Sequence, residues 1–431
     1  MTKINQWIEK YILQIVTVFL FCQPLLDVLT SFSLHYMTLP VTIGTIFRLL
    51  FLGFLLYYFV FINKDSTKKK SFWYLSILFL YLASFLIIVI LKKDASVFLY
   101  ETQGALRTFY FPILLILLMP ILKQKTVLTG KQYVAIMMIY VLFILLPILT
   151  NTGFDSYTQG KVGNIGWFHS TNEISAILSI LLPFCMNQFT TSPSQKRIWI
   201  YRLICFLLIL IVFFSLGTKM AIVSLGVVLC TYGIYFMIQL YQKGKKKALG
   251  AVIATILIGM SLIFVLLPKT SFYQNIKIHL EFLEVENPIQ IITDPEILDH
   301  FIFSSRLSFL ETTSKNYNKA SNIEKLLGIG YIENYATDEM NMKMIEMDPF
   351  DLFYRHGVIG FLLFLLPFLY AIGQAIKREK QDKEIRHKIA FYLSLVLTIF
   401  MSIFTGHVLV APAVSIFVAV VLWNVNERVV A

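Results

Sequence analysis

The sequence predicts an all-α polytopic membrane protein with about twelve transmembrane helices and one large extracytoplasmic loop. Hydrophobic residues make up 57% of the 431 residues and charged residues only 14%. That is more apolar surface than a soluble core of this length can bury. Apolar segments long enough to cross a bilayer recur along the chain, and lysine-rich turns separate many of them.

Hydropathy in a window of about 19 residues predicts the positions of the spans. They lie near residues 11–32, 40–62, 71–91, 108–122, 132–150, 173–190, 198–214, 217–241, 249–267, 355–375, 389–405 and 408–424. The first span lacks a small-residue cleavage site, so we expect it to stay in place. All four cysteines fall inside apolar segments, which indicates small hydrophobic side chains rather than a disulfide framework (Cys22, Cys185, Cys205 and Cys230).

These spans divide the chain into a membrane domain over 1–267, an extracytoplasmic loop over 268–353 and a membrane domain over 354–431. The loop contains fourteen Asp and Glu against seven Lys and Arg, although the whole chain has a net charge of +12. Within the loop we expect a strand at 289–293 and a helix within 304–317.

Basic residues predict the orientation, because short cytoplasmic loops carry an excess of Lys and Arg. The basic turns all fall on one side if both termini are cytoplasmic in a cell membrane (63–70, 123–131, 242–247 and 377–388). Lys92 and Lys93 are the exception, on the outer side. The positive charge therefore indicates topology, and it does not imply nucleic acid binding.

The stretch "IEMDPFDLFYRHGVIG" places three carboxylates at the mouth of the tenth span. Its ordinary interpretation is a helix start, with Asp348 as N-cap, Pro349 at the first helical position and Asp351 in the first turn. Asp351 and Arg355 stand four residues apart and can pair on one helix face. Glu346 has no such local role, and ionisable groups at membrane helices are often functional.

A second polar cluster, "FHSTNE", opens the sixth span. His169 and Asn172 are candidate binding residues there. The alternative is a capping box between Ser170 and Glu173, with His169 at the interface only.

Three further sites carry isolated charges. Lys219 lies at the outer end of the eighth span, where a lysine either snorkels or binds an anion. Arg306 is the only arginine of the large loop. Asp27 and Arg48 stand on adjacent helices and could form an intramembrane charge pair.

The order of these motifs resembles the O-antigen ligase and polymerase family. The resemblance covers about residues 160–370 and includes "SSRLSFLETTSKNY", "LLGIGY" and "GVIGFLLFLLP" in that order. Upstream it depends on hydropathy and on "PLLDVLTSF" and "TIGTIFRLL". It implies a GT-C-like fold and transfer of glycans from a polyprenyl diphosphate carrier at the outer face of the cytoplasmic membrane.

The resemblance also implies roles for single residues. Arg306 matches the loop arginine of the family, and Lys219 occupies a place where ligases commonly have arginine. Ligases show a histidine about eleven residues before the "GxxG" that starts the next helix. Counting back from Gly357 gives Glu346, and similar members carry an acidic "E-x-D" box instead of the histidine.

The chemistry that this resemblance implies is a single displacement that inverts the anomeric centre. Glu346 or Asp348 would accept the proton of the incoming sugar hydroxyl. Lys219 and Arg306 would stabilise the leaving diphosphate, with His169 and Asn172 binding it. Since no "DxD" pair or His/Cys cluster with ligand spacing occurs, we expect no metal and no cofactor.

The sequence favours a polysaccharide polymerase that extends lipid-linked repeat units in cell-wall, capsular or exopolysaccharide synthesis. Its partners would be the lipid-linked donor, a glycan acceptor, the bilayer, a flippase and a chain-length regulator. A ligase that moves finished glycan to another acceptor is one alternative. A lipid-linked glycan flippase, which the pair Asp27 and Arg48 would suit, and a non-catalytic subunit are the others.

Overall fold

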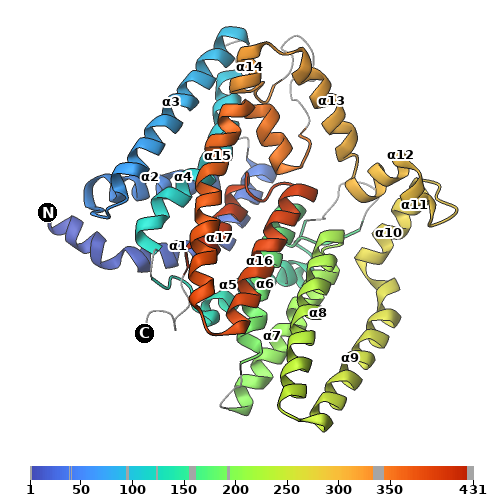
Figure 1. Cartoon of the computed structure of the whole chain (residues 1–431). Coiled ribbons are helices and arrows are strands. Elements are labelled where there is room, and N and C mark those ends of the chain that lie inside the picture. The colour runs from blue at the N-terminus through green and yellow to red at the C-terminus, as the bar shows by residue number, and fades with distance from the viewer. Residues whose placement is uncertain are drawn as a thin grey trace.

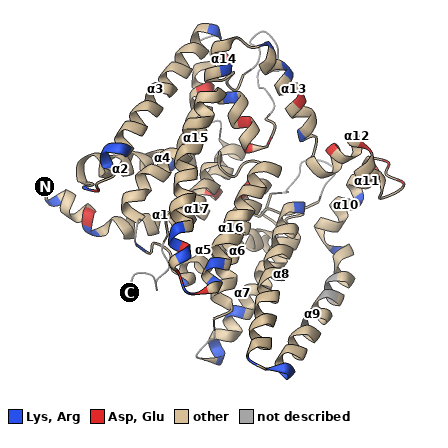
Figure 2. Ribbon diagram, viewed as in Figure 1, with Lys and Arg blue, Asp and Glu red and all other residues tan. Residues whose placement is uncertain are grey.

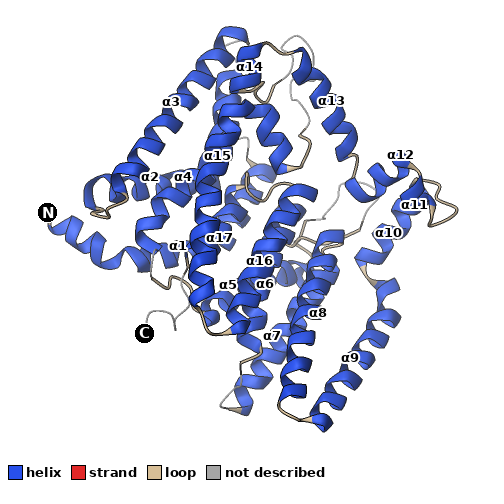
Figure 3. Cartoon of the chain, viewed as in Figure 1, coloured by secondary structure: helices blue, strands red, loops and turns tan. Residues whose placement is uncertain are grey.

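The chain folds into a bundle of long helices with a helical extension on one side (Figure 1). The structure is a computed structural model, and it describes residues 2–37, 39, 41–93, 97–122, 125–154, 162–191, 195–332 and 344–424. Helices and no strands are present in these ranges (Figure 3). The all-α class is therefore confirmed.

Each of the twelve predicted spans coincides with a helix of the described chain. The first nine are α1 (Lys3–Tyr36), α2 (Ile43–Tyr57) with its π-helical continuation η1 (Tyr58–Ile62), α3 (Lys68–Lys92), α4 (Phe98–Leu122), α5 (Gly130–Thr150), α6 (Thr171–Phe189), α7 (Lys196–Ser215), α8 (Lys219–Gln242) and α9 (Lys246–Leu266). The last three are α15 (Asp348–Gln381), α16 (Ile385–Phe404) and α17 (Pro412–Trp423). Ten helices of the described chain are long and apolar enough to cross a membrane.

Helices α6 and α17 are not among those ten, and both lie inside the protein. α6 packs against α5, α8, α16 and α17, and α17 also packs against α4. Polar side chains join α6 to two of these neighbours. Ser179 of α6 bonds Ser224 of α8 at 2.6 Å, and Ser394 of α16 donates to the carbonyl of Ile180 of α6 at 3.0 Å. Small hydroxyl residues of this kind are enriched where membrane helices approach closely.

Between α9 and α15 the chain forms a series of shorter helices. They are η3 (Leu267–Lys269), α10 (Ser271–Phe282), α11 (Gln290–Thr293), α12 (Pro295–Leu298), η4 (Asp299–Phe303), α13 (Arg306–Lys319) and α14 (Asn322–Leu327). The predicted helix within 304–317 is confirmed as α13.

The predicted strand at 289–293 is wrong, because these residues form the helix α11. The side chain of Gln290 accepts the backbone N–H groups of Glu286 and Asn287, both at 3.1 Å, and Asn287 accepts the N–H of Ile289 at 3.0 Å. These local bonds start a helical turn. Since the described chain offers this segment no strand to pair with, its β-branched residues do not determine its structure.

Basic residues gather at the turns between α8 and α9 and between α15 and α16, in the lower half of the view in Figure 2. The two exceptional lysines have acidic partners. Lys92 pairs with Glu324 of α14 at 2.7 Å, and Lys93 pairs with the buried Glu101 of α4 at 2.7 Å. Lys93 also donates to the backbone carbonyl of Ile329 at 2.7 Å, so both lysines attach the loop to the bundle.

Candidate active site

A cavity of about 900 Å³ lies among α1, α2, α4 and the starts of α6 and α17. Its lining includes seven charged or imidazole side chains (Asp27, Arg48, Arg107, His169, Glu173, Glu346 and His407) together with Asn172, Tyr110 and Tyr331. Five of the residues that the sequence singles out therefore share one cavity: Asp27, Arg48, His169, Asn172 and Glu346.

Arg306 reaches this cavity through Glu346. Its guanidinium donates to Glu346 at 2.9 Å, and it also donates to the backbone carbonyls of Phe303 at 3.2 Å and Thr405 at 3.4 Å. The Arg306 side chain is 8% exposed, whereas that of Glu346 is 38% exposed. A buried cation therefore balances a carboxylate that a substrate can reach.

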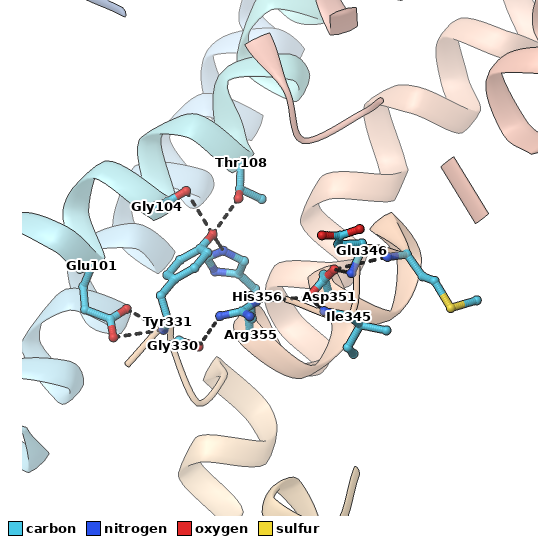
Figure 4. Close-up of polar contacts among 11 residues, drawn as sticks. Glu101, Gly104, Thr108, Gly330, Tyr331, Ile345, Glu346, Asp351, Arg355 and His356 are labelled. Carbon is cyan, nitrogen blue, oxygen red and sulfur yellow. Dashed lines mark hydrogen bonds and ion pairs between the residues drawn. The ribbon is translucent and has the colours of Figure 1, made fainter. Parts of the chain in front are cut away.

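The neighbouring Asp351 holds the backbone of Glu346, which has the uncommon positive φ of 60° (Figure 4). The Asp351 carboxylate accepts the N–H groups of Ile345 at 3.0 Å, Glu346 at 2.8 Å and Met347 at 3.3 Å. Arg355 donates to Asp351 at 3.2 Å, which confirms the predicted pair. Asp351 thus stabilises the strained turn that carries Glu346.

The "LLGIGY" segment packs beside this turn through close backbone contacts. Gly330 donates its N–H to the carbonyl of Arg355 at 3.1 Å, and Arg355 donates back to the carbonyl of Gly330 at 3.4 Å. At Gly328 a Cβ atom would lie 2.0 Å from the Arg355 carbonyl, so only glycine fits. The motif therefore aligns the loop with the start of α15.

Tyr331 completes this junction (Figure 4). Its hydroxyl contacts Thr108 at 2.6 Å and His356 at 2.8 Å, and its backbone N–H donates to Glu101 at 2.9 Å. His356 is fully buried in this network. It does not line the cavity within the described chain.

The sequence predicted Asp348 as the N-cap of α15, and this prediction is wrong. The N-cap is Met347, and Asp348 is the first helical residue. The Asp348 carboxylate is buried and accepts the N–H groups of Val408 at 3.0 Å and Leu409 at 2.7 Å, both from the turn before α17. The Asp348 carboxylate therefore makes a long-range contact with the turn before α17, whereas the sequence predicted that it would cap its own helix.

The start of α6 differs from the proposed capping box. Ser170 accepts the N–H of Glu173 at 3.4 Å, but the Glu173 carboxylate pairs with Arg107 of α4 at 3.0 Å. Burial and the neighbouring His35 lower the pKa of His169 below its ordinary value. The lowered pKa favours the neutral imidazole, which can both donate and accept a hydrogen bond.

The predicted pair of Asp27 and Arg48 is formed, and both side chains are buried. Asp27 also accepts the hydroxyl of Tyr140 at 2.7 Å, and Arg48 donates to Gln23 at 3.1 Å. The pair is therefore fully supported by hydrogen bonds, as a buried ion pair in a membrane requires.

Lys219, in contrast, is not part of the cavity lining among the described residues. It is the first residue of α8. Its ammonium donates to the carbonyl of Phe301 and lies 3.8 Å from the centre of that ring. Since Phe301 belongs to the helix just before Arg306, Lys219 attaches the segment that carries the loop arginine.

Sequence reasoning missed Arg107 and His407, both of which line the cavity. His407 follows Gly406 in the short turn between the last two helices. An ionisable residue in a short turn at the mouth of two membrane helices was the available signal. Arg107 lies in the part of α4 that extends beyond the predicted span, which began at residue 108.

Comparison with known proteins supports the family that these residues indicate. The model of the family described as O-antigen ligase like membrane protein matches residues 9–296 and 287–425. The search of curated proteins produced no match. The two matched segments together include nearly all of the chain, and so this protein belongs to the O-antigen ligase like membrane protein family.

Proposed function

We propose that this protein is a polysaccharide polymerase, which transfers glycan from a polyprenyl diphosphate carrier to a sugar hydroxyl of the acceptor. Membership of the family supports glycan transfer in polysaccharide biosynthesis. The observation that carries the finer proposal is the pair of Glu346 and Arg306, joined at 2.9 Å at the edge of the cavity.

In this proposal Glu346 is the general base. The acceptor hydroxyl oxygen forms a bond to the anomeric carbon, and the bond from that carbon to the diphosphate oxygen breaks. The bonding electron pair leaves with the polyprenyl diphosphate, and the hydroxyl proton passes to Glu346. A positioned base contributes about 10²–10⁴-fold to such a step. One displacement without a covalent intermediate inverts the anomeric centre.

The diphosphate would lie at the side of the cavity lined by Arg107, His169 and Asn172. His169 and Asn172 are at the amino-terminal start of α6, where the helix dipole favours an anion. Lys219 and Arg306 would support the diphosphate through the loop segment that they attach. Asp348, held away in its own contacts, remains the alternative base.

The acidic stretch at Glu346, in place of the histidine of the ligases, favours a polymerase over a ligase. The site would face the outer side of the cytoplasmic membrane, with both termini in the cytoplasm, because the basic turns then obey the charge rule for membrane proteins. A flippase and a chain-length regulator would be its partners in the cell.

The decisive experiment uses the full-length protein purified in detergent with lipid-linked oligosaccharide as donor and acceptor. We expect wild-type protein to make lipid-linked products of more than one repeat. Glu346→Gln should fold and bind donor but lose elongation by about 10²-fold or more, because an amide cannot accept the proton. Glu284→Gln is the matched control, because Glu284 is an exposed loop glutamate with a similar φ of 50°.

Full elongation by Glu346→Gln, with elongation lost in Asp348→Asn, would make Asp348 the base. If wild-type protein does not elongate the glycan in detergent but transports lipid-linked glycan in vesicles, the protein is a flippase and not a polymerase. A product in which the glycan is moved intact to a different acceptor would identify a ligase.

Metal independence is part of the same proposal. Arg48 is already paired with the buried Asp27, whereas the Arg107 side chain is 48% exposed in its pair with Glu173 and would oppose the developing charge of the diphosphate. We expect the elongation rate to be unchanged by EDTA. A rate that falls with EDTA and returns with Mg²⁺ or Mn²⁺ would require a metal in the reaction.

A further inference from the structure

His407 lies in the turn Thr405–Leu409, which joins α16 to α17 and closes one side of the cavity. Its side chain is half-buried and lines the cavity with Glu346. Its Nδ1 atom is buried and has no hydrogen-bond partner among the described residues. The function proposed above gives this imidazole no role.

The turn that carries His407 is in an uncommon conformation. Gly406 and His407 both have positive φ values, 63° and 56°. For a non-glycine residue this conformation costs about 1–3 kcal/mol and persists where surrounding contacts impose it, often at functional sites. Histidine is one of the few non-glycine residues that adopt this conformation readily, so the backbone permits His407 and its contacts hold it there.

The contacts that impose this conformation come from the proposed catalytic residues. Arg306 donates to the Thr405 carbonyl at 3.4 Å, and Asp348 accepts the N–H groups of Val408 and Leu409 at 3.0 and 2.7 Å. The turn also packs directly on the backbone of Glu346, because a Cβ atom at Gly406 would lie 2.5 Å from the backbone carbonyl of Glu346. The same residues that surround Glu346 thus fix the residue between them, His407.

We infer that His407 is a second catalytic residue, whose imidazole hydrogen-bonds the acceptor sugar beside the hydroxyl that Glu346 deprotonates. This inference depends on the function proposed above. His407 and Glu346 come from two turns that pack on each other, whereas Arg107, His169 and Asn172 belong to α4 and the start of α6. In this inference the acceptor contacts the part of the cavity lined by His407 and Glu346. The donor diphosphate contacts the part lined by Arg107, His169 and Asn172.

The test compares His407→Gly with wild-type protein. Glycine adopts positive φ without strain, so this substitution removes the imidazole and leaves the turn free to keep its conformation. Asn151→Gly is the matched control, since Asn151 also has a positive φ, 53°, and is an exposed residue at the end of α5. Elongation of lipid-linked oligosaccharide and thermal stabilisation by polyprenyl diphosphate alone are measured for each protein.

We expect His407→Gly to lose elongation by about 10²-fold and to keep the stabilisation by polyprenyl diphosphate. Asn151→Gly should keep both. Elongation by His407→Gly within about twofold of wild type would overturn the inference. Lost stabilisation by polyprenyl diphosphate would also overturn it, because His407 would then bind the donor.

A second variant separates function from folding. Asparagine tolerates the left-handed conformation, so His407→Asn should fold even if the glycine variant does not. Because an asparagine amide can also bond a sugar hydroxyl, elongation by folded His407→Asn at the wild-type rate would show that the imidazole itself is not required and would overturn the inference. If wild-type protein itself fails to elongate any lipid-linked oligosaccharide, the proposed function fails instead, and that outcome is distinct from loss in the variants alone.

Discussion

Three carboxylates lie within six positions of the chain, and each has a different set of contacts. Glu346 pairs with Arg306 and lines the cavity, whereas Asp351 accepts three backbone N–H groups of the turn that carries Glu346. Asp348 holds the turn before α17. One of the three carboxylates, Glu346, is therefore the candidate base, and the other two, Asp348 and Asp351, hold the turns around it.

The contacts of Asp348 predict opposite results for two substitutions. One oxygen of Asp348, Oδ2, accepts both N–H groups, so Asp348→Asn can keep both bonds and should retain much of the elongation activity. Asp348→Ala leaves two buried N–H groups without an acceptor, at a cost of about 1–3 kcal/mol each. Thermal unfolding in detergent checks this, and equal melting temperatures for the alanine variant and wild type would contradict it.

Arg306 should be sensitive to substitution even by lysine. Its guanidinium bonds Glu346, the Phe303 carbonyl and the Thr405 carbonyl together, which an ammonium on a flexible stem cannot do in the same geometry. We expect Arg306→Lys to retain a small part of the elongation rate and Arg306→Ala to lose it by about 10²-fold or more. Wild-type product length from Arg306→Ala, at a normal protein level, would remove Arg306 from the site.

At the scale of single elements, α15 is two helices joined at Gly357. Its φ of 62° and ψ of −173° interrupt the helix, and a Cβ atom would lie 2.5 Å from the Leu326 carbonyl. This kink lets the end of α14 pack against α15, so the cavity-lining turn and the loop meet there. The "GxxG" motif is therefore a packing contact as well as a sequence marker.

Gly357→Ala should reduce the amount of folded protein. The conformation at φ 62° and ψ −173° is essentially restricted to glycine and costs about 1–3 kcal/mol for other residues, and the close Leu326 carbonyl adds to that cost. Gly373→Ala is the control in the same helix, because no atom lies within 4 Å of its Cβ position. That substitution should stabilise the helix by about 0.5–1 kcal/mol. Size-exclusion profiles and melting temperatures compare the two, and a fully stable Gly357→Ala would contradict the kink's role.

At the scale of the whole molecule, the cavity lies where the loop, the first helices and the last turn meet. Residues from α1, α2, α4 and α6 line it together with residues close to α15 and α17. Lys92 and Lys93 attach the loop to the bundle through Glu324 and the backbone carbonyl of Ile329. The site therefore depends on the assembly of both ends of the chain.

The proposed orientation can be measured with single cysteines. Lys245 lies in the basic turn between α8 and α9 and Glu286 in the large loop, and both are exposed. After replacement of the four native cysteines, a membrane-impermeant maleimide should label Glu286→Cys in intact cells. Lys245→Cys should react only after the membrane is permeabilised. The reverse pattern would place the large loop and the cavity in the cytoplasm.

The sequence by itself determined the all-α class, the helical segment at each predicted span and the family, because hydropathy and motif order are local properties of the chain. It also identified Glu346, Arg306, His169, Asn172, Asp27 and Arg48, five of which line the cavity.

Only the tertiary structure decided that Arg306 pairs with Glu346, 40 positions away, and that Asp348 binds the turn before α17. It also brought His407 to the cavity. Such contacts join segments far apart in sequence, and neither local composition nor residue spacing specifies them.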